Sequence, residues 1–207
     1  GISRHLLDHQ LSQLAKEAGV GLLEECTCHG YTRERDVYRV KTSAGDFLGK
    51  VLCGSFGRHA TGNFFRPERA NQNWVGVKYH VRTDWPEDQI ALHTFRDGYC
   101  GISRVEDGRC CLCYLVKAER LRAYGNRIER LEKEELRLNP YLDALFQNAE
   151  FLWDKPMTVS NITFTAKKPV QDGVFYLGDS AGSIVPLTGN GMSNALRSAS
   201  LLSGLLP

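Results

Sequence analysis

Apolar residues recur at helical spacing near both ends of the chain. Near the start, Leu7, Leu11, Leu14 and Ala18 fall on one face, which predicts a helix from Arg4 to about Ala18. Ser3 is suited to cap this helix and Gly19 to end it. A second helix is predicted from about Gly191, with an apolar stripe formed by Met192, Ala195, Leu196, Ala199 and Leu202.

The middle of the chain alternates apolar and polar residues with a period of two, as a strand with one buried face does. Val75, Val77, Tyr79 and Val81 show the pattern most clearly. Asp97-Gly98 and Asp107-Gly108 are hairpin turn signals, and two-residue turns there would set Arg96 opposite Tyr99 and Glu106 opposite Arg109. The pattern predicts a four-stranded antiparallel meander over residues 74–82, 90–96, 99–106 and 109–116.

The remaining segments complete a mixed α/β order. Strands are predicted over residues 20–28, 31–40, 46–52, 157–166 and 174–177, and helices over residues 119–136 and from Asn139-Pro140 to about Ala149. A sheet inserted between two halves of an α/β layer is typical of two-domain enzymes. We therefore expect an α/β (α+β) two-domain fold, with residues 1–58 and 160–207 in one domain and residues 59–159 in the other.

Composition narrows the classes of protein. The 207 residues carry a net charge of +2 without a basic block, so no nucleic-acid partner is expected. No apolar run approaches the roughly 20 residues of a membrane span, and the charged N-terminal helix is not a signal peptide. The seven cysteines are an odd number, which disfavours a disulfide framework and favours reduced thiols and a cytoplasmic protein. Cys111 and Cys113 would share one strand face, which resembles half a metal site, but small buried apolar residues are the commoner case.

The most informative segment follows the apolar run 174–177. It contains Gly178, Asp179, Gly182, Pro186, Gly189 and Gly191, and it leads into the last helix. A carboxylate at a strand end can accept hydrogen bonds from ligand hydroxyls, glycines allow close backbone approach, and a helix start offers free N–H groups. The alternative is that Asp179 is an ordinary turn or capping residue, but the spacing of the other glycines favours a ligand site.

Other candidates are weaker. Arg4 could reach a phosphate or a ribityl oxygen, although a first-turn arginine is more often solvated. On the meander, Lys78, His80, His93 and Tyr99 could line a substrate pocket, or they could be ordinary residues of a sheet. No residue is assigned as a catalytic acid or base.

The pattern Gly178-Asp179-x-x-Gly182-x-x-x-Pro186-x-x-Gly189-x-Gly191-Met192 resembles the second FAD motif of a large flavoprotein family. That family includes p-hydroxybenzoate hydroxylase, flavin-dependent halogenases and geranylgeranyl reductases, and bacterial FAD-dependent oxidoreductases resemble this chain most. Ser3-Arg4-x-x-Leu7-Asp8 also resembles the helix after the family's first cofactor segment, and Lys50–Arg58 resembles its A-D-G-x-x-S strand end.

The resemblance implies an FAD-dependent oxidoreductase acting on a small or lipid-like organic substrate, with NAD(P)H as electron donor. It implies that Asp179 binds the ribityl chain and that Arg4 lies near the ribityl or phosphate part. Residues Pro186 to Ser193 would pass the flavin ring, with the N–H groups of Met192 and Ser193 facing it. The meander would be the substrate domain.

One departure stands out, because the 207 residues contain no G-x-G-x-x-G to hold the pyrophosphate. Both ends look cut, so we expect part of a larger protein that binds FAD weakly or not at all by itself and is inactive alone. A remnant that has lost the cofactor is the alternative. Hydroxylation and reduction both stay open, whereas halogenation is disfavoured because no Trp-x-Trp-x-x-Pro motif occurs. The oligomeric state is left open.

Overall fold

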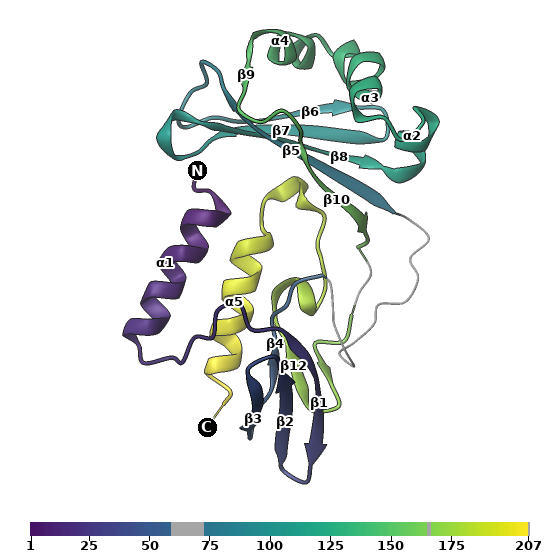
Figure 1. The fold of residues 1–207 in the computed structure, drawn as a ribbon. Helices are drawn as coiled ribbons and strands as arrows, with labels where there is room; N and C mark the ends of the chain where they lie inside the picture. Colours follow the sequence, from purple (N-terminus) through teal and green to yellow (C-terminus); the bar gives the residue numbers. More distant parts are fainter. Residues whose placement is uncertain (59–72, 165–166, 207) are drawn as a thin grey trace. The chain divides into compact units, whose positions relative to one another are not determined.

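The chain forms two units, each with its own sheets and core (Figure 1). The computed structural model describes residues 1–58, 73–164 and 167–206. The first unit consists of Gly1–Leu22 and the described residues of Asn71–Ile162. The second consists of the described residues of Leu23–Ala70 and Thr163–Pro207. Residues 1–22 therefore group with the central sheet, whereas the sequence pattern placed them in one domain with residues 160–207. The cofactor-binding and substrate-binding roles expected of the two domains stay predictions.

The first unit is built on an antiparallel sheet in the order β10-β5-β8-β7-β6. Its strands are β5 (Trp74–Arg82), β6 (Ile90–Phe95), β7 (Gly98–Arg104), β8 (Cys110–Lys117) and β10 (Met157–Ile162), and the short β9 (Glu150–Phe151) pairs with β5. The four predicted strands exist, but their predicted order is wrong, because β5 pairs with β8 along its length. This order places the two most apolar strands at the centre and leaves β6, with exposed Ile90 and Leu92, at the edge.

The turns of this sheet differ from the predicted ones. Phe95 lies opposite Gly98 and Thr94 opposite Tyr99, so the first turn is Arg96-Asp97 and not Asp97-Gly98. Asp97 takes the left-handed conformation (φ 59°), and its carboxylate accepts a hydrogen bond from Lys117 Nζ at 2.9 Å. A Cβ at Gly98 would overlap the Phe95 ring, which explains the glycine at the start of β7.

The second connection is a short 3₁₀ turn, η1 (Glu106–Gly108), between β7 and β8. The ladder therefore closes at Arg104 opposite Cys110, and Glu106 does not lie opposite Arg109 as a strand pair. The two charges still meet, with Arg109 Nη2 at 3.6 Å from Glu106 Oε1.

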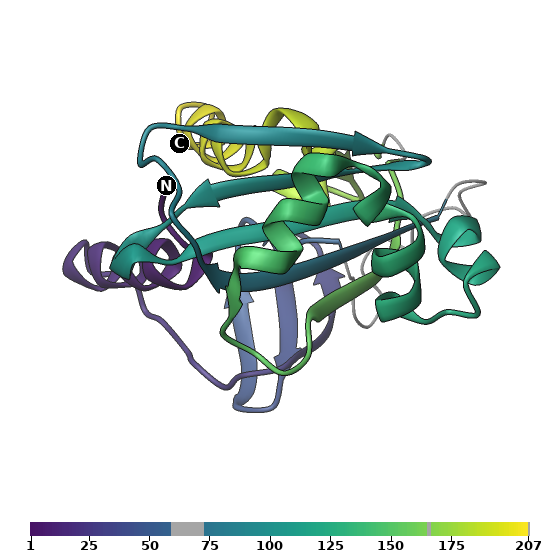
Figure 2. The same ribbon diagram turned by 90° about the horizontal axis from the view of Figure 1, so that it is seen from above.

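Helices cover one face of this sheet (Figures 1 and 2). They are α2 (Ala118–Ala123), α3 (Ile128–Glu134), η2 (Leu136–Leu138) and α4 (Pro140–Asn148). The single helix predicted over 119–136 is broken, because Gly125 (φ 70°) and Asn126 (φ 58°) adopt left-handed backbone. The start of α4 is as predicted, since the Asn139 side chain accepts a hydrogen bond from Tyr141 N at 3.0 Å.

The core of the first unit lies between these helices and the sheet. Its buried members come from alternate positions of the central strands and from the helices: Val75, Val77, Tyr79, Val81, Cys100, Ile102, Cys110, Leu112, Tyr114, Val116, Ala118, Leu121, Leu131, Leu136, Leu142 and Leu145. The opposite face carries the intervening residues of each strand.

The predicted N-terminal helix is α1 (Arg4–Glu17), capped by Ser3, whose hydroxyl accepts a hydrogen bond from Leu6 N at 3.3 Å. The Ser3 N–H also donates to Glu106 Oε2 at 2.9 Å, which ties the helix start to the β7–β8 connection. The Glu106 carboxyl has its pKa lowered to about 2, chiefly by its hydrogen bonds to Ser3.

The second unit begins with an antiparallel sheet of β1 (Cys28–Glu34), β2 (Val37–Thr42) and β3 (Gly45–Gly49). The strand predicted over 31–40 is divided, because Arg35 adopts φ 56° in the turn between β1 and β2. The strand predicted over 20–28 is wrong: only Cys28 belongs to a strand, and the apolar Val20 and Leu23 are exposed.

A small mixed sheet carries the candidate loop. It contains β4 (Cys53–Gly54), β11 (Val170–Gln171) and β12 (Val174–Tyr176), with β12 parallel to β4. After β12 come the 3₁₀ turns η3 (Gly178–Ser180) and η4 (Pro186–Thr188), and then α5 (Gly191–Ser203). Tyr38, Val174 and Tyr176 form the buried core of this unit. In the described part of the chain, no helix has the length and apolar character needed to span a bilayer.

Candidate functional site

The predicted loop begins where two parallel strands end. Leu177 N donates to Gly54 O at 2.9 Å, so the segments that follow β4 and β12 leave the sheet at the same edge. The buried Ser180 hydroxyl accepts a hydrogen bond from Gly57 N at 2.9 Å and joins these two segments. Ligands of α/β layers bind at the carboxyl ends of parallel strands, and Asp179 lies at that end of β12.

Asp179 is flanked by two cations. Arg58 Nε lies 4.0 Å from Asp179 Oδ2, and Lys167 Nζ donates to the Asp179 carbonyl oxygen at 3.1 Å. Burial lowers the pKa of Lys167, and the charge of Arg58 lowers it further against the opposing effect of Asp179. The Asp179 side chain is 44% exposed, so its carboxylate oxygens keep lone pairs available for a ligand.

Sequence reasoning did not single out Arg58 or Lys167 as site residues. Arg58 closes the Gly-Ser-Phe-Gly-Arg segment after β4, and that glycine-rich break was the available signal. Lys167 follows two undescribed residues, and nothing in its local sequence marks it. Both reach Asp179 only because the chain returns to the same sheet edge.

Gly178 is required by packing. It adopts φ 56°, and a Cβ on it would lie 3.0 Å from the Cβ of Ala195 on α5. Its N–H donates to Ser198 Oγ at 3.1 Å, so the strand end and the last helix are in direct contact. This contact brings α5 against the loop that precedes it.

Further along the loop, Gly182 and Gly189 adopt positive φ angles, which glycine adopts more readily than other residues. Gly189 adopts the left-handed conformation (φ 68°) after η4, which begins at Pro186, and its N–H donates to Pro186 O at 3.0 Å. Gly182 lies at φ 150°. No atom of the described residues lies within 4 Å of a Cβ placed on Gly189 or Gly191, so this part of the structure leaves the space beside both residues open.

The start of α5 offers backbone donors that have no partner within the helix. The first i→i−4 bond of the helix runs from Asn194 N to Asn190 O at 2.9 Å, so the N–H groups of Gly191, Met192 and Ser193 precede it. The Asn190 side chain makes no capping hydrogen bond. These N–H groups carry the partial positive charge of a helix start.

Arg4 lies in the first unit, whereas Asp179 lies in the second. The Arg4 guanidinium forms a two-point ion pair with Asp8 one turn later, with Nε–Oδ1 at 3.1 Å and Nη2–Oδ2 at 3.0 Å. Its side chain is 66% exposed, as expected of a solvated first-turn arginine. A role of Arg4 in cofactor binding stays a prediction.

The structure divides the candidate substrate residues between the two faces of the sheet. His93 lies on the face that the helices cover, stacked on Tyr141 with ring centroids 5.7 Å apart. The other face carries Lys78, His80 and Tyr99. There the His80 ring lies against the Trp153 ring, with the two ring centroids 4.6 Å apart. Burial and the nearby charge of Lys78 lower the pKa of His80.

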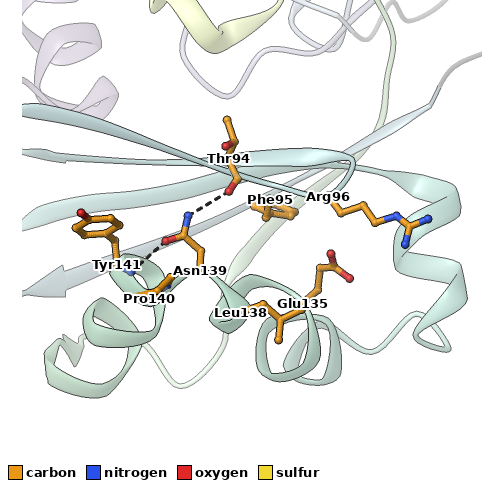
Figure 3. A pocket seen from close by; sticks show the side chains of 8 residues that line it. All are labelled: Thr94, Phe95, Arg96, Glu135, Leu138, Asn139, Pro140 and Tyr141. Atoms are coloured by element: carbon orange, nitrogen blue, oxygen red, sulfur yellow. Dashed lines mark hydrogen bonds between the residues drawn. The ribbon is translucent and has the colours of Figure 1, made fainter.

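A separate depression of about 410 Å³ lies at the edge of the first unit (Figure 3). Its walls are formed by Thr94, Phe95, Arg96, Glu135, Leu138, Asn139, Pro140 and Tyr141. The Asn139 amide group donates to Thr94 O at 3.1 Å and holds α4 against the end of β6. None of the residues predicted to bind a cofactor lines this depression. Among residues 1–58, 73–164 and 167–206, no three His, Cys, Asp or Glu side chains form a cluster suited to a metal ion.

Comparison with family models and with curated proteins gives no match for this sequence. Solved structures do match. A flavoprotein/dehydrogenase from Cytophaga hutchinsonii superposes with a TM-score of 0.74 over 97% of this chain and 54% of its own, at 15% identity. HpxO from Klebsiella pneumoniae, solved with FAD and uric acid, gives a TM-score of 0.70 over 98% of this chain and 54% of its own, at 20% identity.

The myxobacterial chondrochloren halogenase CndH gives a TM-score of 0.75 over 100% of this chain and 53% of its own, at 16% identity. The chain has the fold of FAD-dependent flavoproteins. The predicted fold class is therefore confirmed, and the likeness noted in the sequence motif extends to the whole chain. The chain spans about half the length of these neighbours.

Proposed function

We propose that the protein is an FAD-dependent oxidoreductase and that the segment from Gly178 to Ser193 holds the ribityl and ring portion of the flavin. The observation that carries the proposal is the combination of a flavoprotein fold over the whole chain with this loop. Within the loop, a half-exposed carboxylate at a strand end is followed by open glycines and an uncapped helix start. Bound flavin would supply two-electron redox chemistry that protein side chains lack.

The residues present suit such a group. Among the described residues, the ion pair of the Asp179 carboxylate is the 4.0 Å contact with Arg58, so its oxygens can accept hydrogen bonds from ribityl hydroxyls without breaking a close ion pair. The N–H groups of Met192 and Ser193 favour the negative charge that a flavin ring gains on reduction. Arg58 and Lys167 add positive charge beside the same strand end, which favours an anionic cofactor.

We further propose that the first unit binds the substrate, a small or lipid-like organic molecule. Lys78, His80 and Tyr99 share the sheet face that the helices leave uncovered, and they combine a cation, an imidazole and a phenol in a largely apolar sheet. NAD(P)H is the proposed electron donor. Product analysis with and without oxygen separates hydroxylation, which needs oxygen, from hydride transfer to an alkene, which does not.

Flavin binding tests the proposal directly. Titration of FAD, followed by quenching of flavin fluorescence, should give an affinity about tenfold weaker for Asp179→Asn, the loss of about one charge-assisted hydrogen bond. Riboflavin should show the same ratio, because the contact is with the ribityl chain. Asp46→Asn is the matched control, since Asp46 is equally exposed at 44% and pairs with Arg39 in the separate sheet of β1, β2 and β3. Equal affinities of Asp179→Asn and wild type would refute the role of Asp179.

A second candidate function is a remnant that keeps the flavoprotein fold without the cofactor. The absence of G-x-G-x-x-G from the 207 residues favours it, because that motif supplies the usual pyrophosphate contacts. The same titration separates the two. Saturable binding that depends on Asp179 supports the oxidoreductase, whereas no binding of FAD or riboflavin by the folded chain supports the remnant.

A further inference from the structure

Two cations converge on the strand end that carries Asp179. Arg58 lies shortly after β4 and Lys167 shortly before β11, and both of these strands pair with β12. Gly57 N donates to the hydroxyl of the buried Ser180 at 2.9 Å, which fixes the backbone beside Arg58. The backbone therefore brings both cations to this strand end, and their positions do not depend on attraction to Asp179 alone.

Each cation keeps hydrogen-bond donors for a ligand. Arg58 faces Asp179 through Nε, at 4.0 Å from Oδ2, which is longer than a hydrogen bond. Within the described residues, its Nη1 and Nη2 groups have no hydrogen-bond acceptor. Lys167 Nζ donates to the Asp179 carbonyl oxygen at 3.1 Å, and an ammonium group carries three donors. The strand end thus holds more positive than negative charge, with donors to spare.

Balancing the charge of Asp179 does not require both cations. A 4.0 Å ion pair between side chains that are 31% and 44% exposed contributes little to stability, because water screens it. Burial and the charge of Arg58 both lower the pKa of Lys167, so each cation disfavours the other. An additional anion at this place would remove that repulsion.

The chemistry of a flavin supplies such an anion. In FMN and FAD, a phosphate is esterified to the end of the ribityl chain, which is the part that Asp179 is proposed to bind. A carboxylate and a phosphate on the same short chain repel each other unless cations lie beside them. A guanidinium group can bind two phosphate oxygens at once through parallel hydrogen bonds, and an ammonium group binds them as a point charge.

We propose that Arg58 and Lys167 bind the flavin phosphate nearest the ribityl chain, which is the 5′-phosphate of FMN and the corresponding phosphate of FAD. The inference rests on the proposed function, because it takes Asp179 as the ribityl contact. The Arg58 guanidinium donates to the phosphate oxygens, and Lys167 adds a second positive charge. This subsite makes the chain selective for phosphorylated flavins over riboflavin, through residues other than a G-x-G-x-x-G loop.

Titration with three flavins tests the subsite through binding and needs no turnover. Riboflavin, FMN and FAD are each titrated into the whole chain, followed by flavin fluorescence. The quantity compared is the Kd of riboflavin divided by the Kd of FMN. We expect this ratio to be about tenfold or more in the wild type, the effect of about one charge-assisted hydrogen bond, and FAD should follow FMN. A wild-type ratio near one would overturn the inference, whether or not any variant folds.

Variants assign the two contacts. Arg58→Met should lower the ratio about tenfold and leave the riboflavin Kd within about twofold of the wild type, which also shows that the variant is folded. Lys167→Met should lower the ratio less, because it removes a charge but not a two-point contact. Arg39→Met is the matched control and should keep the wild-type ratio. Arg39 is similarly exposed, at 37% against 31%, and also pairs with a carboxylate, Asp46, but in the sheet of β1, β2 and β3.

The outcomes separate this inference from the proposed function. Riboflavin binding that depends on Asp179, with a ratio that Arg58→Met leaves unchanged, would overturn the phosphate subsite and keep the flavin site. If that variant instead weakens only the binding of NADPH, the cations belong to the electron donor and the inference is also wrong. No binding of riboflavin, FMN or FAD by the folded chain would overturn both proposals.

Discussion

Glu132 is a buried carboxylate whose removal has a calculable effect. It lies on α3 at 9% exposure, and its Oε1 accepts hydrogen bonds from Tyr79 and Tyr114 hydroxyls, each at 2.8 Å. Burial raises the pKa of Glu132 more than the two hydroxyls lower it. The carboxylate is therefore needed as an acceptor, while its ionised form is disfavoured.

The two roles predict different losses for two substitutions. Glu132→Ala leaves two buried hydroxyls without their acceptor, at about 1–3 kcal/mol each, so we expect the free energy of unfolding to fall by about 2–6 kcal/mol. Glu132→Gln keeps an oxygen for both hydroxyls and removes the buried charge. The free energy of unfolding of Glu132→Gln at pH 7 should therefore lie at most about 1 kcal/mol below that of the wild type.

The pH dependence has a definite sign. Because the folded-state pKa of Glu132 lies above the ordinary value of 4.5, the folded state binds this proton more tightly than the unfolded state. Stability contributed by the group is complete below pH 4.5 and is lost as pH rises through the folded pKa. The stability of Glu132→Gln should lack this pH-dependent component. The free energy of unfolding of the variant should therefore rise relative to that of the wild type as pH increases.

Urea unfolding followed by tryptophan fluorescence measures both effects. The three tryptophans, Trp74, Trp85 and Trp153, all belong to the first unit, so the signal reports the unit that contains Glu132. Glu134→Gln, an exposed carboxylate on the same helix paired with Arg130, is the control and should cost no more than about 0.5 kcal/mol. A Glu132→Gln protein as unstable as Glu132→Ala, with an unchanged pH profile, would refute the reasoning.

Three further predictions concern other contacts. Asn139→Ala should lower the free energy of unfolding by about 2 kcal/mol in the same urea assay, because it removes both the α4 cap and the hydrogen bond to Thr94 O. Asn139→Asp should recover only the part due to the cap, because a carboxylate cannot donate to Thr94 O. Gly178→Ala should lower the free energy of unfolding by about 1–3 kcal/mol, because Gly178 has a positive φ and a Cβ there would press against Ala195. Thermal unfolding followed by circular dichroism measures this loss, and Gly191→Ala, where a Cβ meets no described atom, should lower stability far less. Glu106 has a depressed pKa of about 2, so its contribution to α1 is present above pH 4.5 and is lost as pH falls toward 2. Glu106→Gln should weaken hydrogen-exchange protection at the start of α1 at pH 7 and remove this acid dependence.

Local patterns predicted most of the elements of the first unit. Alternation located β5 to β8 within one or two residues, and the Ser3 and Asn139 caps located the starts of α1 and α4. The order of the strands could not be read in the same way, because alternation says which face of a strand is buried and not which strand lies beside it. The turn at Arg96-Asp97 shows the same limit, since the Lys117 contact that stabilises Asp97 comes from another strand.

For the candidate site, the sequence by itself determined the loop. A carboxylate after an apolar strand, glycines at fixed spacing and a helix start are all local features, and they are where the sequence pattern placed them. Only the tertiary structure decided what meets Asp179: Arg58 reaches it through the parallel pairing of β4 with β12, and Lys167 reaches it through the antiparallel pairing of β11 with β12. The same holds for Cys111 and Cys113: their shared face follows from strand period, while Lys78 and His80 come beside them only through the pairing of β5 with β8.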